Sequence, residues 1–215
     1  MKFFQKFSKL NNKIFIRDLK SIKEGGIKIL IEVRFHGRGG QGVVTAADIL
    51  AVAAFKEGYY TLSFPMFGAE KRGTPVASFL RISDEPIVLR DEVYTPDYVV
   101  LLDPTVIESV NVLAGLKENG MLIANYPKSA EDLMKELRAE EFKVKVLTIN
   151  ATKLAMEILG RAITNTAMVG AFAGATKIVS LNTLLDTINE WFKGELAEKN
   201  AKLVEKAYKY MEGFV

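Results

Sequence analysis

The sequence predicts an α/β fold, a single three-layer α/β/α domain around a mixed, mostly parallel sheet. From Leu30 onward, short runs rich in β-branched and aromatic residues alternate with longer segments of helical periodicity. The 215 residues, 49% of them hydrophobic, suffice for one domain with a sizeable core. No repeat or low-complexity linker divides the sequence. These three observations together favour one compact unit.

Seven short runs are predicted as strands because they are rich in β-branched or aromatic residues. They are residues 30–35, 59–64, 76–82, 87–90, 98–103, 121–125 and 143–149. Ser-Asp-Glu-Pro at residues 83–86 is typical of a turn, which predicts that 76–82 and 87–90 pair antiparallel. The sheet is therefore expected to be mixed.

Helical periodicity predicts seven helices. They are residues 43–57, 105–116, 130–139, 151–159, 166–178, 183–192 and 195–211. The first is apolar nearly all round, so we expect it to lie buried close to the sheet. The last carries apolar residues at helical spacing among charged ones, so it is expected to cover the core as an amphipathic helix.

The composition excludes several kinds of site within this chain. The sequence contains no cysteine and one histidine, His36. A cysteine-ligated iron–sulfur cluster, a thiolate zinc site, a disulfide or a cysteine nucleophile would need cysteine, and a two-histidine zinc site would need a second imidazole. His36 has no carboxylate beside it in the motif, so we expect it to position a loop through a hydrogen bond. No catalytic residue and no metal ligand are predicted.

The charge is distributed unevenly along the chain. Residues 1–28 hold eight Lys and Arg against two Asp and Glu, a net charge of +6, whereas the rest holds 21 against 24, a net charge of −3. Nucleic-acid-binding domains usually cluster cations on the folded face. No run of about 18 apolar residues is present to span a bilayer. We therefore expect a cytoplasmic protein with neither nucleic acid nor membrane as a partner.

Residues 1–29 form a basic leader with two competing interpretations. Four apolar residues would share one side of a helix, which favours a segment lying at a membrane surface. These are Phe3, Phe7, Leu10 and Ile14. Lys-Glu-Gly-Gly at residues 23–26 can also be encoded by a purine-rich ribosome-binding sequence, which would place the start codon at Leu30 and leave the leader untranslated. The intact mass of the native protein decides between them.

The strongest local feature is a glycine-rich turn, FHGRGGQG at residues 35–42, between a predicted strand and a predicted helix. The backbone N–H groups of such a turn and the helix N-terminus favour an anion, and Arg38 would add a fixed, bidentate charge. The candidate ligand contacts are Gly37, Arg38, Gly39, Gly40, Gln41 and Gly42. The alternative is that the glycines serve only a tight turn beneath a close-packed helix.

Two nucleotide-binding motifs fit this turn poorly. The glycines satisfy G-x-G-x-x-G, but a dinucleotide site also needs an acid at the end of the second strand, and none occurs between Glu57 and Glu70. A Walker loop needs Lys and Ser or Thr after the last glycine, where Val43 and Val44 stand. The sequence therefore disfavours NAD and retains some other anion.

Two further segments are expected to reach the same crevice. FPMFGAEKRGTP at residues 64–75 is a long, Pro- and Gly-containing loop after a strand, which would bring Glu70 and Arg72 beside the glycine-rich turn. The alternative is that both charges are simply solvated. In ITNTAMVGA at residues 163–171, Asn165 and Thr166 are candidate ligand contacts, and capping of the following helix is an equal alternative for Asn165.

Three ordered motifs carry a family resemblance. FHGRGGQG, FPMFGAEKRGTPV and ITNTAMVGAFA resemble the gamma subunit, or gamma domain, of the 2-oxoacid:ferredoxin oxidoreductases, pyruvate synthase included. The likeness runs from about Ile31 to the C-terminus, so residues 30–215 are assigned to this gamma domain. The resemblance implies an α/β/α unit with a mixed sheet.

The resemblance also implies a reaction and a division of labour. Enzymes of that family oxidise a 2-oxoacid with coenzyme A to an acyl-CoA and carbon dioxide, and two electrons pass to ferredoxin. For pyruvate, the favoured oxoacid, the reaction converts pyruvate, coenzyme A and oxidised ferredoxin to acetyl-CoA, carbon dioxide and reduced ferredoxin. Thiamine diphosphate, Mg and the iron–sulfur clusters lie on partner subunits, so this chain is expected to carry no cofactor and to be inactive alone. Its expected partners are the alpha, beta and delta subunits, with ferredoxin reached through the complex. The glycine-rich turn with Arg38 is then a candidate contact for an anionic group of coenzyme A, which is a substrate.

Other functions remain open at this stage. Related enzymes for 2-oxoisovalerate, 2-oxoglutarate or indolepyruvate have similar gamma units, and nothing in this chain reads the substrate side chain. A free-standing nucleotide- or CoA-binding module would instead bind its ligand as a stable monomer. A membrane-surface protein would require the basic leader to be made.

Overall fold

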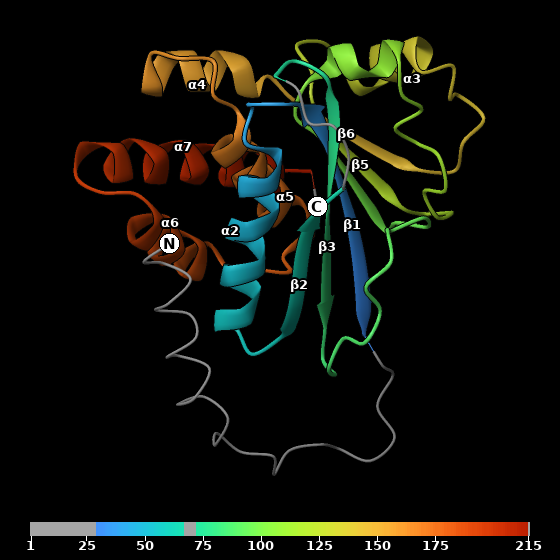
Figure 1. The fold of residues 1–215 in the computed structure, drawn as a ribbon. Helices are drawn as coiled ribbons and strands as arrows, with labels where there is room; N and C mark the ends of the chain where they lie inside the picture. Colours follow the sequence, from blue (N-terminus) through green and yellow to red (C-terminus); the bar gives the residue numbers. More distant parts are fainter. Residues whose placement is uncertain (1–28, 67–71, 215) are drawn as a thin grey trace.

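The computed structural model describes residues 29–66 and 72–214, so the predicted leader lies outside the described residues except for Ile29. The fold is built on a six-stranded sheet in the order β2-β3-β1-β4-β5-β6 (Figure 1). The strands are β1 Leu30–Arg38, β2 Tyr60–Pro65, β3 Pro75–Ser83, β4 Tyr98–Leu101, β5 Met121–Asn125 and β6 Lys145–Ile149. β1, β4, β5 and β6 pair parallel, whereas β3 pairs antiparallel with both β1 and β2. The predicted mixed, mostly parallel sheet is confirmed.

Helices cover both faces of this sheet, as predicted for an α/β fold. They are α2 Val43–Lys56, the 3-10 helix η2 Pro104–Glu108, α3 Ala130–Glu136, α4 Ala151–Leu159, α5 Asn165–Thr176, α6 Leu181–Trp191 and α7 Glu195–Glu212. Figure 1 shows α2 and α4 to α7 on one side of the sheet and α3 on the other. None of the described helices is both long enough and apolar enough to cross a bilayer.

The face that carries α2 holds most of the core. α5 is buried along almost its whole length, because it lies between the sheet and α7. Gly170 and Gly174 make this possible, since a Cβ at either glycine would collide with the backbone of Val204 or Tyr208 in α7. The predicted amphipathic cover by the last helix is confirmed, and it depends on two glycines one turn apart.

The opposite face is covered in two different ways. Over β4, β5 and β6, side chains such as Leu101 and Leu122 pack against Val106 of η2 and Leu133 of α3. Over β1 and β3, the cover is the irregular segment of residues 84–97. Two buried guanidinium groups, Arg34 of β1 and Arg81 of β3, hold this segment by donating to its backbone carbonyls.

The predicted strand at residues 87–90 is wrong. β3 is already paired on both sides, with β1 and with β2, so no position beside it is left for a hairpin partner. The carbonyls of Leu89 and Asp91 instead accept hydrogen bonds from the Arg81 guanidinium at 3.2 and 2.8 Å. Hydrogen bonds from the charged Arg81 side chain therefore take the place of the expected pairing between two strands.

The predicted helix at residues 105–116 is also wrong beyond its first turn. Only the 3-10 helix η2 forms, and it ends at Glu108. Asn111 then turns the chain by accepting from the N–H of Leu113, and the carbonyls of Val112 and Ala114 accept from Arg34. The buried arginine thus uses carbonyls that a helix would have kept for itself.

Candidate functional site

The candidate site lies where the chain leaves the sheet in two opposite directions. β1 and β4 are parallel neighbours, but the chain passes from β1 through α2 to β2 on one side and from β4 to β5 on the other. In open α/β sheets, ligands bind in the crevice that such divergent loops create at the carboxyl ends of the strands. The glycine-rich turn follows β1 here, and residues 102–105 follow β4.

Steric constraints explain why the turn has glycine at these positions. Gly40 and Gly42 have φ of +88° and +76°, a conformation that L side chains rarely adopt. A Cβ on Gly37 would lie 2.7 Å from Cγ2 of Val43, and one on Gly42 would collide with the side-chain amide of Asn165. The turn therefore needs glycine for close packing whether or not it also binds a ligand.

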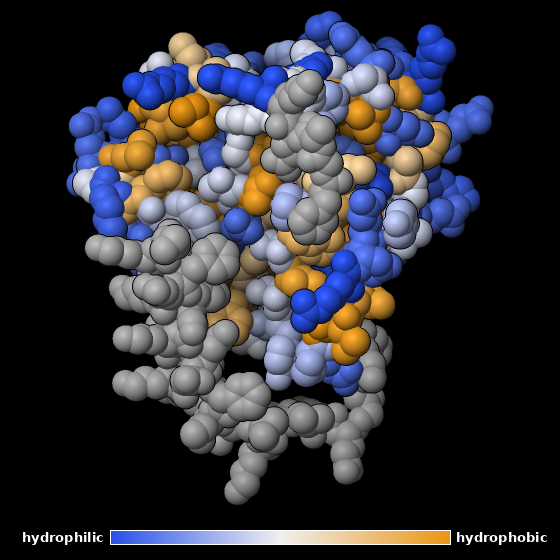
Figure 2. Space-filling model, in the orientation of Figure 1, coloured by the Kyte–Doolittle hydropathy of each residue, from blue (hydrophilic) through white to orange (hydrophobic). Residues whose placement is uncertain are grey.

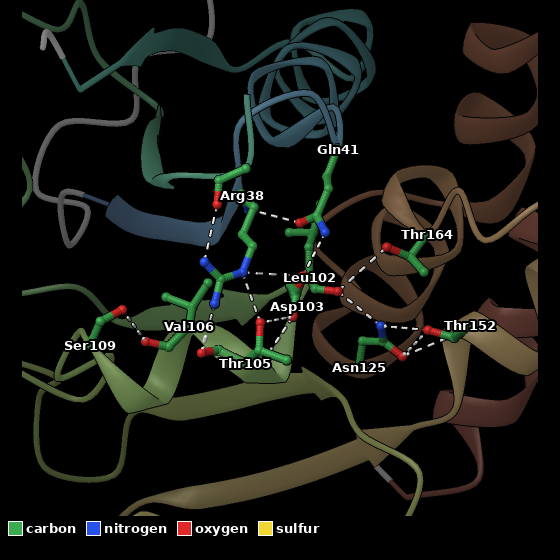
Figure 3. A network of polar contacts seen from close by, with 11 residues as sticks. Arg38, Gln41, Leu102, Asp103, Thr105, Val106, Ser109, Asn125, Thr152 and Thr164 are labelled. Atoms are coloured by element: carbon green, nitrogen blue, oxygen red, sulfur yellow. Dashed lines mark hydrogen bonds and ion pairs between the residues drawn. The ribbon is translucent and has the colours of Figure 1, made fainter. Parts of the chain in front are cut away.

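Arg38 ends β1 and spans the crevice toward β4 (Figure 3). Its Nε donates to Oγ1 of Thr105 at 2.8 Å, and its two terminal nitrogens donate to the carbonyls of Gly73 and Thr105, both at 3.1 Å. The side chain is 28% exposed and lies 3.8 Å from the Asp103 carboxylate. Arg38 thus joins three separate loops while keeping part of its charge accessible.

Gln41 connects the glycine-rich turn to the end of β4. Its Oε1 accepts from the backbone N–H of Arg38 at 2.7 Å, and its Nε2 donates to Asp103 at 2.6 Å. Partial burial alone would raise the pKa of Asp103, but hydrogen bonds from Gln41 and Thr105 and the charge of Arg38 hold it below its ordinary value. Asp103 is therefore ionised at neutral pH and fixes the turn through charged hydrogen bonds.

Two helices begin beside this turn without a side-chain cap. α2 starts after Gly42 and α5 after Thr164, and neither has an acidic residue in its first turn. The side chain of Asn165 lies against Gly42, so the two helix N-termini meet at the crevice. The first N–H groups of a helix have no intrahelical acceptor and carry partial positive charge. The crevice is thus electrostatically suited to an anion.

The second predicted loop does approach the first. Arg72 lies close to Gly40, where a Cβ would come within 3.6 Å of its Cγ. Two backbone hydrogen bonds join the loops, from Gly39 to the carbonyl of Thr74 and from Gly73 to the carbonyl of Gly39. Arg72 itself is exposed. Glu70 lies outside the described residues.

The third predicted segment is placed differently from expectation. The N-cap of α5 is Thr164, without a side-chain cap bond, and Asn165 is the first helical residue, accepting from the N–H of Thr166. The alternative in which Asn165 caps α5 is therefore wrong by one residue, because the N-cap is Thr164. Thr166 is fully buried and donates to Asn200 of α7, so it faces the core rather than the crevice.

The residues after β4 and β5 were not predicted as site residues. Asn125, the last residue of β5, donates to the Leu102 carbonyl at 2.8 Å and to Thr152 of α4 at 3.0 Å, beside the Arg38 network (Figure 3). A shallow hollow next to it is lined by Pro104, Asn125, Pro127, Asn150, Thr152 and Lys153. An Asp and an Asn at consecutive strand ends were the available signal, since carboxyl ends of parallel strands share one edge.

His36 is buried on the other side of β1 from α2. Its Nε2 accepts from Nε of Arg34 at 3.0 Å, and burial together with the Arg34 charge lowers its pKa to about 3. His36 is therefore a neutral acceptor at physiological pH. Through Arg34 it helps to hold residues 93, 112 and 114, rather than the glycine-rich turn.

Within the described residues, no three His, Cys, Asp or Glu side chains are grouped so as to hold a metal ion. The 215-residue sequence has no cysteine. The residues present do not fit an iron–sulfur cluster, which needs thiolate ligands.

Comparison with known proteins gives one consistent answer. The family model described as pyruvate ferredoxin/flavodoxin oxidoreductase matches residues 32–210. The chain is 52% identical over 179 residues to the pyruvate/ketoisovalerate oxidoreductases common subunit gamma of Thermococcus kodakarensis, covering 83% of this chain and 96% of that protein. It is also 52% identical over 182 residues to pyruvate synthase subunit PorC of Methanocaldococcus jannaschii, covering 85% of this chain and 97% of that one.

A solved structure agrees with these sequence matches. The crystal structure of pyruvate oxidoreductase subunit PORC from Thermotoga maritima superposes with a TM-score of 0.74 at 34% identity, covering 84% of this chain and 96% of that one. A family match over most of the chain and relatives at about half identity leave no ambiguity of family. The chain belongs to the pyruvate ferredoxin/flavodoxin oxidoreductase family.

Proposed function

We propose that this chain is the gamma subunit of a cytoplasmic pyruvate:ferredoxin oxidoreductase. The assembled enzyme converts pyruvate, coenzyme A and oxidised ferredoxin to acetyl-CoA, carbon dioxide and reduced ferredoxin. The observation that carries the proposal is the identity of 52% to a pyruvate synthase subunit over 97% of that protein's length.

The chain contributes structure and substrate contacts, and it is inactive alone. It has no cysteine for a cluster, and among the described residues the carboxylate of the crevice, Asp103, is held by hydrogen bonds from Gln41 and Thr105. Thiamine diphosphate, Mg and iron–sulfur clusters belong in this proposal to the alpha, beta and delta subunits, which supply decarboxylation and electron transfer. Ferredoxin receives electrons from the complex.

The oxoacid is selected elsewhere in the complex. The Thermococcus kodakarensis relative is named as a subunit common to pyruvate and ketoisovalerate oxidoreductases, at the same 52% identity as the pyruvate synthase subunit. A gamma subunit shared by two oxoacid enzymes would not itself read the oxoacid side chain. Use of 2-oxoisovalerate through a second set of partners is therefore the second candidate function.

The glycine-rich turn is proposed to receive an anionic group of coenzyme A. Support comes from the two uncapped helix N-termini, the partly exposed Arg38 and the exposed Arg72 beside Gly40. Gln41 and Asp103 hold the turn in shape. Thr166 is proposed to pack α5 on α7 and Asn165 to place α5 against Gly42, because both are buried.

The experiment is anaerobic isolation of the native protein with its associated subunits. The fraction is then assayed for ferredoxin reduction with coenzyme A and each of pyruvate, 2-oxoisovalerate, 2-oxoglutarate and indolepyruvate. We expect larger subunits carrying thiamine diphosphate and iron–sulfur clusters to co-purify, and pyruvate to drive reduction. A lone monomer that binds coenzyme A unaided would instead identify a free-standing binding module.

A further inference from the structure

The strand β2 is an edge strand with a free outer side within the described part of the chain. The sheet order starts at β2, whose single partner there is β3. All six of its residues are half-buried or exposed, although the strand lies in a sheet whose other strands are largely buried. An edge strand presents a row of backbone N–H and C=O groups that can pair with another strand.

β2 has little of the usual protection of such an edge. Residues 59–66, YYTLSFPM, contain no charged side chain, whereas natural edge strands usually carry charges, Lys above all, that block further pairing. Pro65 lacks a backbone N–H and limits pairing at the end of the strand, so Tyr60–Phe64 is the part left open. The opposite edge, β6, begins with Lys145 and is also covered in part by contacts with α3 and α7. An uncharged edge of this length would promote aggregation unless another chain covers it.

A row of apolar side chains lies along one face of β2. Leu62 and Phe64 stand opposite Arg81 and Phe79 of β3, so they share the face that the irregular segment partly covers. The Arg81 guanidinium lies over the Phe64 ring at 5.8 Å from its centroid and donates to the Leu89 carbonyl. The helix α2 packs on the other face of β2. No helix of the described chain therefore buries this row.

The surface around the row is exposed and apolar. Tyr60 and Met66, at the two ends of the row, are both 45% exposed, and Val88 is 86% exposed. Figure 2 shows hydrophobic residues beside strongly hydrophilic ones over the lower ends of β2 and β3. We name the surface formed by Tyr60, Leu62, Phe64, Met66, Val88 and Leu89 the β2 edge surface. Single exposed apolar residues are ordinary, but a contiguous group marks an interaction site.

The charge at one end of this surface is negative. Residues 84–92 hold four acidic side chains against one arginine, and Asp84 and Glu85 are exposed next to Ser83, which pairs with Tyr60. A segment that pairs with β2 would therefore be favoured by a cationic residue at its Tyr60 end. Because β2 itself carries no charged side chain, it favours no particular charge along the rest of the paired segment.

We propose that β2 is extended by a strand from a partner subunit of the same oxidoreductase. The partner segment is extended, apolar at every second position, and carries Lys or Arg at the end that meets Asp84 and Glu85. Backbone hydrogen bonds with β2 supply affinity. The apolar side chains at every second position of the partner segment pack on Leu62 and Phe64 and so fix the register of the pairing. This inference rests on the proposed role of the chain as a subunit of a larger enzyme.

The test is site-specific photo-crosslinking in the assembled enzyme. Tyr60→p-benzoylphenylalanine keeps an aromatic side chain at the exposed end of β2. We expect a crosslink to a partner subunit, within a few residues of a Lys or Arg in an extended segment. Tyr210→p-benzoylphenylalanine on α7, at a site 50% exposed, is the matched control and should not reach that segment. A crosslink to a second copy of this chain, or none outside the chain itself, overturns the proposal.

A second variant measures the energetic contribution of the edge. Leu62→Glu places a carboxylate opposite the Arg81 guanidinium, so the fold of this chain should tolerate the substitution. The same carboxylate adds a charge to the edge strand and should oppose pairing with a partner strand. Its affinity for the remaining subunits should fall by about tenfold or more, whereas Leu62→Val should assemble normally. Normal assembly of Leu62→Glu contradicts the proposal. If the complex assembles and oxidises pyruvate without any Tyr60 crosslink, only this inference fails; if no partner subunits co-purify, the proposed function fails.

Discussion

Arg34 and His36, two residues apart on β1, bury a positive charge and a neutral imidazole on the same face of the sheet. Among the described contacts, Arg34 is balanced by carbonyl groups of residues 93, 112 and 114, and burial lowers its pKa. A proton on His36 would place a second charge beside the guanidinium. The pair therefore makes the fold sensitive to acid.

This sensitivity has a definite sign. The pKa of His36 is about 3 in the folded chain and about 6.5 in the unfolded one, so between these values the unfolded chain binds a proton that the folded chain does not. The free energy of unfolding should fall as the pH falls below about 6.5, by at most ~1.4 kcal/mol per pH unit. His36→Gln keeps an acceptor for Arg34 and should flatten this dependence. Urea unfolding of both chains at pH 7, 6 and 5 measures it, and equal slopes would contradict the assignment.

Gly42 offers a second prediction at this scale. Gly42→Ala should cost ~1–2 kcal/mol for the left-handed backbone, and further free energy because its Cβ would displace Asn165. Gly160→Ala is the matched control, since Gly160 has a similar φ of +68° with nothing within 4 Å of a new Cβ. The free energies of unfolding of the two variants should differ by more than ~1 kcal/mol. If the two variants lost similar free energies of unfolding, Asn165 would be able to move aside at no energetic cost, and this prediction would be contradicted.

At the scale of elements, α5 and α7 pack closely because Gly170 and Gly174 have no Cβ. Gly170→Ala would raise helix propensity by ~1 kcal/mol, but the new Cβ would press on the Val204 carbonyl and move α7. We expect a net loss of ~1–3 kcal/mol, typical of overpacking. Gly213→Ala, at the end of α7 with its nearest neighbour 3.6 Å away, should be tolerated. Thermal unfolding compares them; a stabilised Gly170→Ala variant would contradict the close contact.

The same scale shows which elements the sequence could predict. Residues 121–125 and 151–159 form β5 and α4 with the predicted bounds, because each has a clear period and a polar or glycine boundary. Residues 87–90 and 105–116 have suitable composition for a strand and a helix, yet 87–90 is irregular and only the first turn of 105–116 is helical. Their backbone carbonyls bind Arg81 and Arg34, which lie far away in sequence on β3 and β1. Local propensity cannot register such long-range partners.

At the scale of the whole molecule, the sheet topology explains the position of the crevice. The glycine-rich turn was identifiable from the sequence because it joins a strand to a helix. Arg72 was also expected beside it, but it comes close because it leads into β3, which pairs with β1 at Arg38 and Pro75. Asp103 was missed as a partner of Gln41 and Arg38, because pairing β1 with β4 requires a crossover that no local pattern specifies. The hydrogen bond from Thr166 to Asn200 of α7 was likewise beyond any local pattern.

The sheet carries a polar crevice at the carboxyl ends of its strands and an apolar surface along its β2 edge. The crevice lies at the carboxyl ends of β1, β4 and β5, whereas the β2 edge surface lies at the side of the sheet beyond β3. The two places meet where β2 runs into residues 64–75, because β2 and β1 are both antiparallel to β3 and end at the same edge of the sheet. Substitutions at the Tyr60 end of β2 are therefore the ones expected to leave the crevice intact, as usually holds for distant sites.

The most direct measurement is the apparent KM for coenzyme A of the assembled enzyme carrying Arg38→Ala. Loss of a charged hydrogen bond to an anion costs ~1.5–3 kcal/mol, so we expect the KM for coenzyme A to rise about 10- to 100-fold. The KM for pyruvate should stay unchanged, and Arg38→Lys should give an intermediate value because it keeps the charge without the bidentate geometry. An unchanged KM for coenzyme A would contradict the proposed role of the glycine-rich turn.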